Sequence, residues 1–193
     1  PGGGLKTGGG GYGGRGGNGY YVPFAPGPTY GASNAPVEPG SGGGGHSSSQ
    51  LGSEGGGAVR IEANGAVTVN GTISANGQDS QQGGSGSGGA RYITCRTFTG
   101  SNGVVRANGG NGGTHFSRGG GGGGGRMAIV YDPAAQAGMT PAPWIRISAN
   151  QGAWYPDHVS EPGTIWMPDT QVFPNPAIME GGQIMVPGFT SWA

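Results

Sequence analysis

Uninterrupted glycine tracts constrain this chain more than any other feature of its sequence. Residues 119–125 are seven consecutive glycines, residues 42–45 are four, and glycine accounts for 50 of the 193 residues. Glycine loses more conformational freedom on folding than any other residue, so an ordered tract needs neighbours that hydrogen-bond its backbone. Two structures suit such tracts: long surface loops, or extended polyproline-II-like strands that pack side by side because no Cβ atoms separate them. We favour the packed strands for at least some tracts.

Low charge and low hydrophobicity limit what else the chain builds. Charged residues make up 9% of the sequence, below the usual share of about 25%, and hydrophobic residues other than glycine make up only 32%. Nine basic and nine acidic residues cancel, so we expect no general attraction to nucleic acid or to an anionic membrane. No apolar run approaches the roughly 20 residues that span a bilayer. We therefore expect a thin core, with backbone hydrogen bonds carrying much of the stability.

The segments between the glycine tracts repeat a common pattern. Each unit opens after a glycine run, and three units end in Ala-Asn, at Asn76, Asn108 and Asn150. A fourth unit begins near Pro162. Self-similarity over a few tens of residues is typical of stacked repeat proteins.

Alternating side chains predict that each unit consists of strands. Val59 and Ile61 alternate with Arg60 and Glu62, which is the period-two pattern of a half-buried strand. Short strands of the same kind are predicted at residues 58–62, 66–69, 72–75, 91–96, 126–131, 145–149 and 164–167.

Turn residues and helix breakers complete the prediction of the fold class. Asn-Gly pairs at 64–65, 70–71 and 76–77 favour tight turns between short strands. Residues 134–137 offer one helical turn, and we expect no helix longer than about three turns. The predicted fold is all-β: a glycine-rich repeat, solenoid or β-helix-like, with extended polyproline-II-like glycine tracts.

Composition divides the chain into three regions. Residues 1–57 are rich in Gly, Tyr and Pro, residues 58–150 hold the glycine-punctuated β repeats, and residues 151–193 are rich in aromatic side chains. The chain opens on Pro1 without an initiator methionine, from which we expect a processed terminus or the edge of a longer chain.

Several stretches resemble the glycine-rich repeats of very large bacterial surface proteins. These stretches are GYGGRGG (11–17), TYG (29–31), GGGAVRI (55–61), VNGTISANG (69–77) and GGGGGRMAIVY (121–131). The resemblance covers roughly residues 8–172 and implies a β-helical, secreted or cell-surface polypeptide, with no catalytic residues to carry over. Few charges and abundant Asn, Gly, Ser and Thr also favour an extracellular or cell-surface location.

No group of residues predicts a reaction or a cofactor. The histidines, none in a metal-spaced pair, are His46, His115 and His158. Asp157 and His158, with Asp169 and Glu180, are the nearest approach to an acid–base or metal cluster, but adjacent strand residues face opposite ways. Calcium is a weak alternative, because Asp79 is isolated and a calcium site needs six to eight oxygens. Cys95, the single cysteine, is expected to be a buried apolar residue.

Aromatic residues near the C-terminus, with tyrosines near the N-terminus, form the candidate contact surface. Such side chains stack on sugar rings, cap the open end of a solenoid, or seat a neighbouring subunit. The candidates for subunit or glycan contact are Trp154, Tyr155, Trp166, Phe189, Trp192, Tyr12, Tyr20 and Tyr21.

A structural role without enzymatic activity is therefore the leading hypothesis. The chain is expected to be a subunit or segment of a bacterial extracellular fibre or surface layer, self-associating through its dissimilar ends into a head-to-tail homopolymer. The alternative is a glycan-binding, adhesin-like module that uses the C-terminal aromatics on extracellular polysaccharide. An enzyme such as a polysaccharide lyase on a β-helix ranks third.

Overall fold

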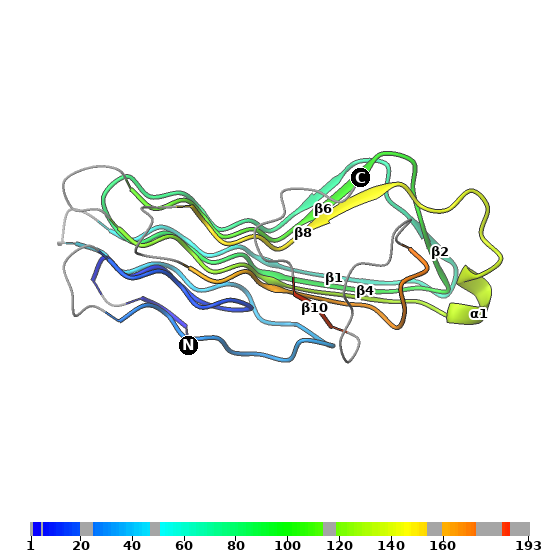
Figure 1. The fold of residues 1–193 in the computed structure, drawn as a ribbon, viewed down its shortest axis with the longest axis horizontal. Coiled ribbons are helices and arrows are strands. Elements are labelled where there is room, and N and C mark those ends of the chain that lie inside the picture. The colour runs from blue at the N-terminus through cyan, green and yellow to red at the C-terminus, as the bar shows by residue number, and fades with distance from the viewer. Residues whose placement is uncertain are drawn as a thin grey trace.

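β-strands form nearly all the regular structure in this computed structural model (Figure 1). The structure describes residues 2–4, 6–19, 25–46, 51–113, 119–153 and 160–172, together with the backbone of 183–185. In these residues the strands are β1 (Ala58–Glu62), β2 (Ala66–Thr68), β3 (Thr72–Ser74), β4 (Ala90–Thr94), β5 (Thr97–Thr99), β6 (Gly103–Arg106), β7 (Arg126–Val130), β8 (Ile145–Ser148), β9 (Thr164–Trp166) and β10 (Gln183–Met185), and the helix is α1 (Pro133–Gln136). This content confirms the all-β prediction.

The strands form three separate sheets. One has the order β1-β4-β7-β9-β10, a second pairs β2 with β5, and a third has the order β3-β6-β8. All the pairs are parallel except β9 with β10, which is antiparallel. Strands that follow successive glycine segments of the sequence therefore lie side by side.

Apolar residues line up across the parallel strands. In the five-stranded sheet Ile61 is aligned with Ile93, and Ile93 with Ile129. Because successive side chains of a strand point to opposite faces, aligned residues of parallel strands share a face. Each sheet thereby presents one apolar face.

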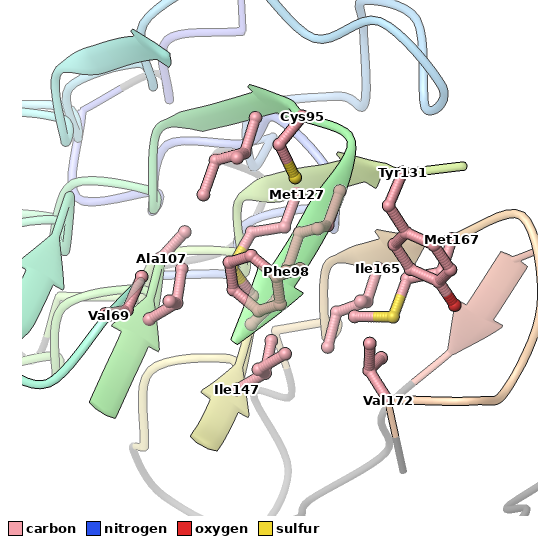
Figure 2. Packing of buried hydrophobic residues seen from close by; sticks show 14 residues of the cluster. Val69, Cys95, Phe98, Ala107, Met127, Tyr131, Ile147, Ile165, Met167 and Val172 are labelled. Atoms are coloured by element: carbon pink, nitrogen blue, oxygen red, sulfur yellow. The ribbon is translucent and has the colours of Figure 1, made fainter. Parts of the chain in front are cut away.

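A hydrophobic core lies where these apolar faces meet (Figure 2). Phe98 of β5 and Ile147 of β8 pack in the same cluster as Met127 and Ile165 of the five-stranded sheet. Cys95 is a buried free thiol in this cluster, as predicted. The first strands contribute less, since Ile61, Val67 and Ile73 are only partly buried against the core.

Away from this core, glycine backbones pack directly against one another. All seven residues of 119–125 are buried. A Cβ atom on Gly122 would lie 1.9 Å from the carbonyl oxygen of Gly86, and one on Gly123 would lie 2.1 Å from that of Gly14. These spaces admit no side chain. This tract is therefore closely packed inside the molecule, as predicted, and is not a surface loop.

Successive glycines of this tract bond to different neighbouring segments. Gly122 and Gly125 donate their amide hydrogens to the carbonyl oxygens of Gly110 and Ala107, at 2.9 and 2.7 Å. Gly123, between them, donates instead to Gly10, at 2.9 Å. Residues three apart thus bond to the same segment.

The described part of residues 1–57 packs against these glycine segments. Gly13 and Gly14 both donate to the carbonyl oxygen of Gly124, at 3.0 and 2.8 Å, and Gly17 donates to Gly121 at 2.8 Å. In Figure 1 this region is the blue layer that runs beneath the strands leading into β1 and β4. The N-terminal region therefore forms part of the same glycine packing.

The seven predicted strands are all present, with ends displaced by at most two residues. The predicted helical turn at 134–137 is α1, which begins after Asp132; the Asp132 carboxylate accepts the amide hydrogens of Ala134 and Ala135, at 2.9 and 3.3 Å. β5, β6 and β10 were not predicted. β5 and β10 have only three residues each and, unlike the equally short β2 and β3, do not lie between two Asn-Gly pairs; β6 begins on a glycine.

Candidate functional site

The structure describes only two of the eight predicted contact residues, Tyr12 and Trp166. Lying outside the described residues are Trp154, Tyr155, Phe189, Trp192, Tyr20 and Tyr21. The predictions for these six positions stay predictions.

Tyr12 lies inside the molecule, in a polar cluster beneath the five-stranded sheet. Its side chain has 0% exposure, and its ring centre lies 4.7 Å from that of Tyr30. The Tyr12 hydroxyl donates to the Glu38 carboxylate at 3.3 Å, and the Tyr30 hydroxyl donates to the carbonyl oxygen of Pro39 at 2.5 Å. In this arrangement the Tyr12 ring offers no surface to a sugar or a second subunit.

Arg126 joins this cluster to the sheet above it. Its Nε donates to the carbonyl oxygen of Tyr30 at 2.7 Å, and its Nη1 donates to Thr164 Oγ1 at 3.2 Å. The guanidinium lies 5.7 Å from the centre of the Tyr12 ring, within the range of a cation–π contact. The cluster thus ties the N-terminal layer to β7 and β9.

Titration in this cluster favours a structural role. Burial raises the pKa of Tyr12 above the usual value for tyrosine, and the neighbouring Glu38 carboxylate raises it further. Burial also raises the pKa of Tyr30, although a hydrogen bond from Ser41 opposes this shift. Both phenols therefore stay protonated and act as hydrogen-bond donors.

Trp166 belongs to a row of residues on the outer face of the five-stranded sheet. The strand register aligns Arg60 with Tyr92, Tyr92 with Ala128, and Ala128 with Trp166. Tyr92 and Trp166 are half-buried, and the Arg60 guanidinium lies 5.5 Å from the centre of the Tyr92 ring. This row places two aromatic side chains on one face, two strands apart.

Acidic and histidine side chains do not gather into a metal site in the described residues, where no three His, Cys, Asp or Glu side chains come together. Asp169 instead accepts a hydrogen bond from the Tyr131 hydroxyl. Its carboxylate also accepts hydrogen bonds from the backbone amide and the side-chain amide of Gln171. Asp79 accepts the Asn111 amide hydrogen at 2.6 Å. Among the other suggested residues, His46 is exposed, and His115, Asp157, His158 and Glu180 lie outside the described residues.

One end of the strand stack is covered on two of its three sheets. β10 pairs antiparallel with β9, covers the outer edge of that strand, and is itself the last strand of the five-stranded sheet. On the second sheet, Gln136 of α1 takes the place of another strand beside β5. Its Oε1 accepts the Phe98 amide hydrogen at 2.8 Å, and its Nε2 donates to the Phe98 carbonyl oxygen at 3.1 Å.

The opposite end of the stack consists of β1, β2 and β3, each an outer strand of its sheet. The burial of these strands alternates between half-buried and exposed residues, whereas strands of the following units are largely buried. No strand of the described residues pairs with their outer edges. We call this surface, residues 58–77, the open end.

Sequence reasoning missed both the Gln136 contact and a buried arginine in the core. Arg91 has 0% exposure, and its Nε and Nη2 atoms have no hydrogen-bond partner among the described residues. Nη1 donates to the carbonyl oxygen of Ala90 at 2.8 Å. The one signal for its burial was its position in the repeat, because Arg91 aligns with Val59 and Met127, whose side chains face inward.

Comparison with protein-family models, curated proteins and solved structures gives no match for this chain. In the part of the chain that the structure describes, no helix combines the length and hydropathy that a membrane crossing requires. The functional conclusions below therefore depend on the geometry of the chain itself.

Proposed function

We propose that this chain is a structural, self-associating module of a bacterial extracellular fibre or surface layer. The direct packing of glycine backbones is the observation that carries this proposal. In the buried tract 119–125, a side chain at any position would meet a neighbouring backbone or side-chain atom at 2.6 Å or less. A sequence so restricted serves to hold chain segments together.

We also propose that the glycine tracts are polyproline-II helices and that the stacked strands form a solenoid. Polyproline II has three residues per turn and no internal hydrogen bonds, so its amides are free to bond neighbours. Gly122 and Gly125, three residues apart, donate hydrogen bonds to the same neighbouring segment, and this spacing supports the assignment. The parallel pairing of β1, β4, β7 and β9 supports successive turns of a solenoid.

Two further features favour self-association. The open end presents the outer edges of three strands, and such edges are templates for pairing with another chain. The formal net charge is zero, so long-range repulsion between copies is small. No cofactor is needed for this role.

Light scattering or sedimentation velocity of the full chain over a wide range of concentrations tests the proposal. We expect the mass-average molecular mass to rise with concentration, equally with added calcium and with EDTA. A chain that remains monomeric at every concentration would rule out the self-associating function. A rise only with calcium would instead assign the ion a structural role.

Glycan binding is the second candidate function. Trp144 is 55% exposed, and the half-buried Tyr92 and Trp166 share the outer face of one sheet. Exposed aromatic rings of this kind suit stacking on sugars. Retention of the chain on immobilised polysaccharides, lost on Trp144→Ala or Trp166→Ala, would favour this function; absence of retention on any polysaccharide tested would reject it.

A further inference from the structure

The two ends of the strand stack differ in how their edges are covered. β10 and Gln136 cover the outer edges of β9 and β5, whereas β1, β2 and β3 have no strand against their outer edges within the described residues. The chain enters β1 from residues 55–57, and Gly55 and Gly56 pack against other glycine segments. The segment that precedes β1 therefore leaves the open end uncovered.

We propose that the open end is the docking surface for a second copy of this chain, with β1 of one copy antiparallel to β1 of the other about a two-fold axis. This inference rests on the proposed self-association and names the surface that performs it. A head-to-tail contact would pair β1 with β10, the outer strand at the far end, which runs antiparallel to β9 and so interrupts the parallel register of the sheet. A contact between two open ends instead places like against like, and a two-fold contact of this kind closes as a dimer.

The outer edge of β1 carries backbone groups that can form this contact. The amide of Ala63 bonds to Thr94 of β4, at 2.9 Å. In a parallel pair alternate residues bond to a given neighbour, so residues 59, 61 and 63 face β4. The amide and carbonyl groups of Ala58, Arg60 and Glu62 therefore point outward along the open edge.

Charge selects one register for the antiparallel pair. Arg60 and Glu62 lie on the same exposed face and form an ion pair of 2.6 Å within one copy. A two-fold axis at Ile61 places Arg60 of each copy opposite Glu62 of the other, so that oppositely charged side chains face each other across the strands. A shift of the axis by one residue would place Arg60 opposite itself, and like charges directly opposite destabilise a strand pair.

Apolar side chains favour the same register. Ile61 is partly buried against the core, and the two-fold axis brings the two Ile61 residues together as a close, non-hydrogen-bonded pair. The core faces of the two sheets then lie on the same side, so the half-buried apolar residues of both open ends cover one another. The surface has 20 residues (58–77), at the lower limit of roughly 20–30 residues per side for a stable interface. We therefore expect a weak dimer, and longer assembly needs a second contact elsewhere.

Charge exchange on β1 tests this contact directly. Arg60→Glu and Glu62→Arg are each measured alone by sedimentation velocity of the full chain, with circular dichroism to verify the fold. Each variant places like charges opposite one another in the dimer, and we expect each to weaken association by about tenfold. The double variant R60E/E62R restores the charge pairing and should dimerise like the wild type.

A mixture of the two single variants gives a sharper result. One variant carries two carboxylates on β1 and the other carries two guanidiniums, so the mixed dimer regains both opposite-charge pairs. Recovery of the dimer only on mixing would support the two-fold register. If the wild-type chain associates and all of these variants associate equally well, the inferred contact is wrong but the proposed self-association stands. A wild-type chain that never associates would instead overturn both.

Cysteine cross-linking provides a second readout that does not depend on charge. Ile61→Cys places two thiols at the two-fold axis, where the pair spacing suits a disulfide. Val59→Cys is the matched control, because in this register its two copies lie about 13 Å apart, beyond the reach of a disulfide. Oxidation should yield a covalent dimer for I61C and none for V59C. Equal cross-linking of the two would contradict the register.

Discussion

At the scale of single residues, glycine in this molecule takes the place that apolar side chains hold in an ordinary interior. Backbone amides and carbonyls bond directly between segments, as in the 2.9 Å bond from Gly88 to Gly123. Glycines outside the packed segments are under no such constraint, and an added Cβ on Gly65 would meet no atom of the described residues within 4 Å. Whether a given glycine can be replaced therefore depends on whether it lies in a packed segment.

Gly122→Val is expected to lower the free energy of unfolding by about 3 kcal/mol or more, because its Cβ would lie 1.9 Å from the Gly86 carbonyl oxygen. Gly65→Ala is the control, with an expected effect within about 1 kcal/mol. Urea denaturation followed by circular dichroism gives both values. Equal stabilities for the two variants would show that residues 119–125 are not closely packed.

Arg91→Met is expected to stabilise the protein, against the usual effect of a core substitution. Burial lowers the pKa of Arg91 to about 10, so the guanidinium remains charged at neutral pH, with two nitrogen atoms that lack partners in the described part of the chain. An uncompensated buried charge is costly, and methionine fills a similar volume. We expect a gain of about 1–3 kcal/mol in the free energy of unfolding at pH 7. A loss of stability would mean that the guanidinium has a compensating partner.

At the scale of elements, strands were predictable where alternation was long, or where Asn-Gly pairs marked both ends of a short strand, as at β2 and β3. β1 and β7 have five residues with clear patterning, and both were found. β5 has three residues, and its pairing depends on β2 and on Gln136, which are distant in sequence. Long-range contacts of this kind leave no local signal, which is also why the cluster of Tyr12 with Arg126 was not foreseen.

Gln136→Ala is expected to destabilise the covered end of the stack. The substitution leaves the buried amide and carbonyl of Phe98 without partners, at a cost of about 1–3 kcal/mol. Gln171→Ala, at an exposed glutamine, is the matched control and should cost less than about 1 kcal/mol. Amide exchange at Phe98 should accelerate in Q136A alone. Unchanged exchange there would contradict the role of Gln136 as a substitute strand.

Alkaline pH is expected to destabilise the protein through its buried tyrosines, Tyr12 and Tyr131. Burial raises the pKa of Tyr12 and of Tyr131 above the unfolded value of about 10. Their neutral forms therefore contribute in full below pH 10, and the contribution is lost as the pH rises through the folded values. Arg91 opposes this loss, because burial lowers its folded pKa to about 10, below the usual value for arginine. The free energy of unfolding should fall above pH 10, more steeply in R91M; a rise would contradict the burial of these phenols.

At the scale of the whole molecule, glycine packing and a small hydrophobic core are two consecutive parts of one stack. The same segments run from the packed glycines, such as 119–125, directly into strands such as β7 (Figure 1). Sequence indicated this division, because glycine tracts and alternating strands are both local patterns. It did not indicate that β10 and Gln136 cover one end and leave the other open, since this depends on where each segment lies in the stack.

Hydrogen exchange of the amides of residues 119–125 tests the central claim, that packed glycine backbones hold the molecule together. Buried amides bonded to neighbouring segments exchange only when the structure opens. We expect the amides of Gly122, Gly123 and Gly125 to be protected as strongly as those of β4 and β7, and to exchange together with them in the global unfolding reaction. Exchange of these glycine amides at the rate of an unstructured peptide, while β4 and β7 stay protected, would show that glycine packing does not hold the molecule together.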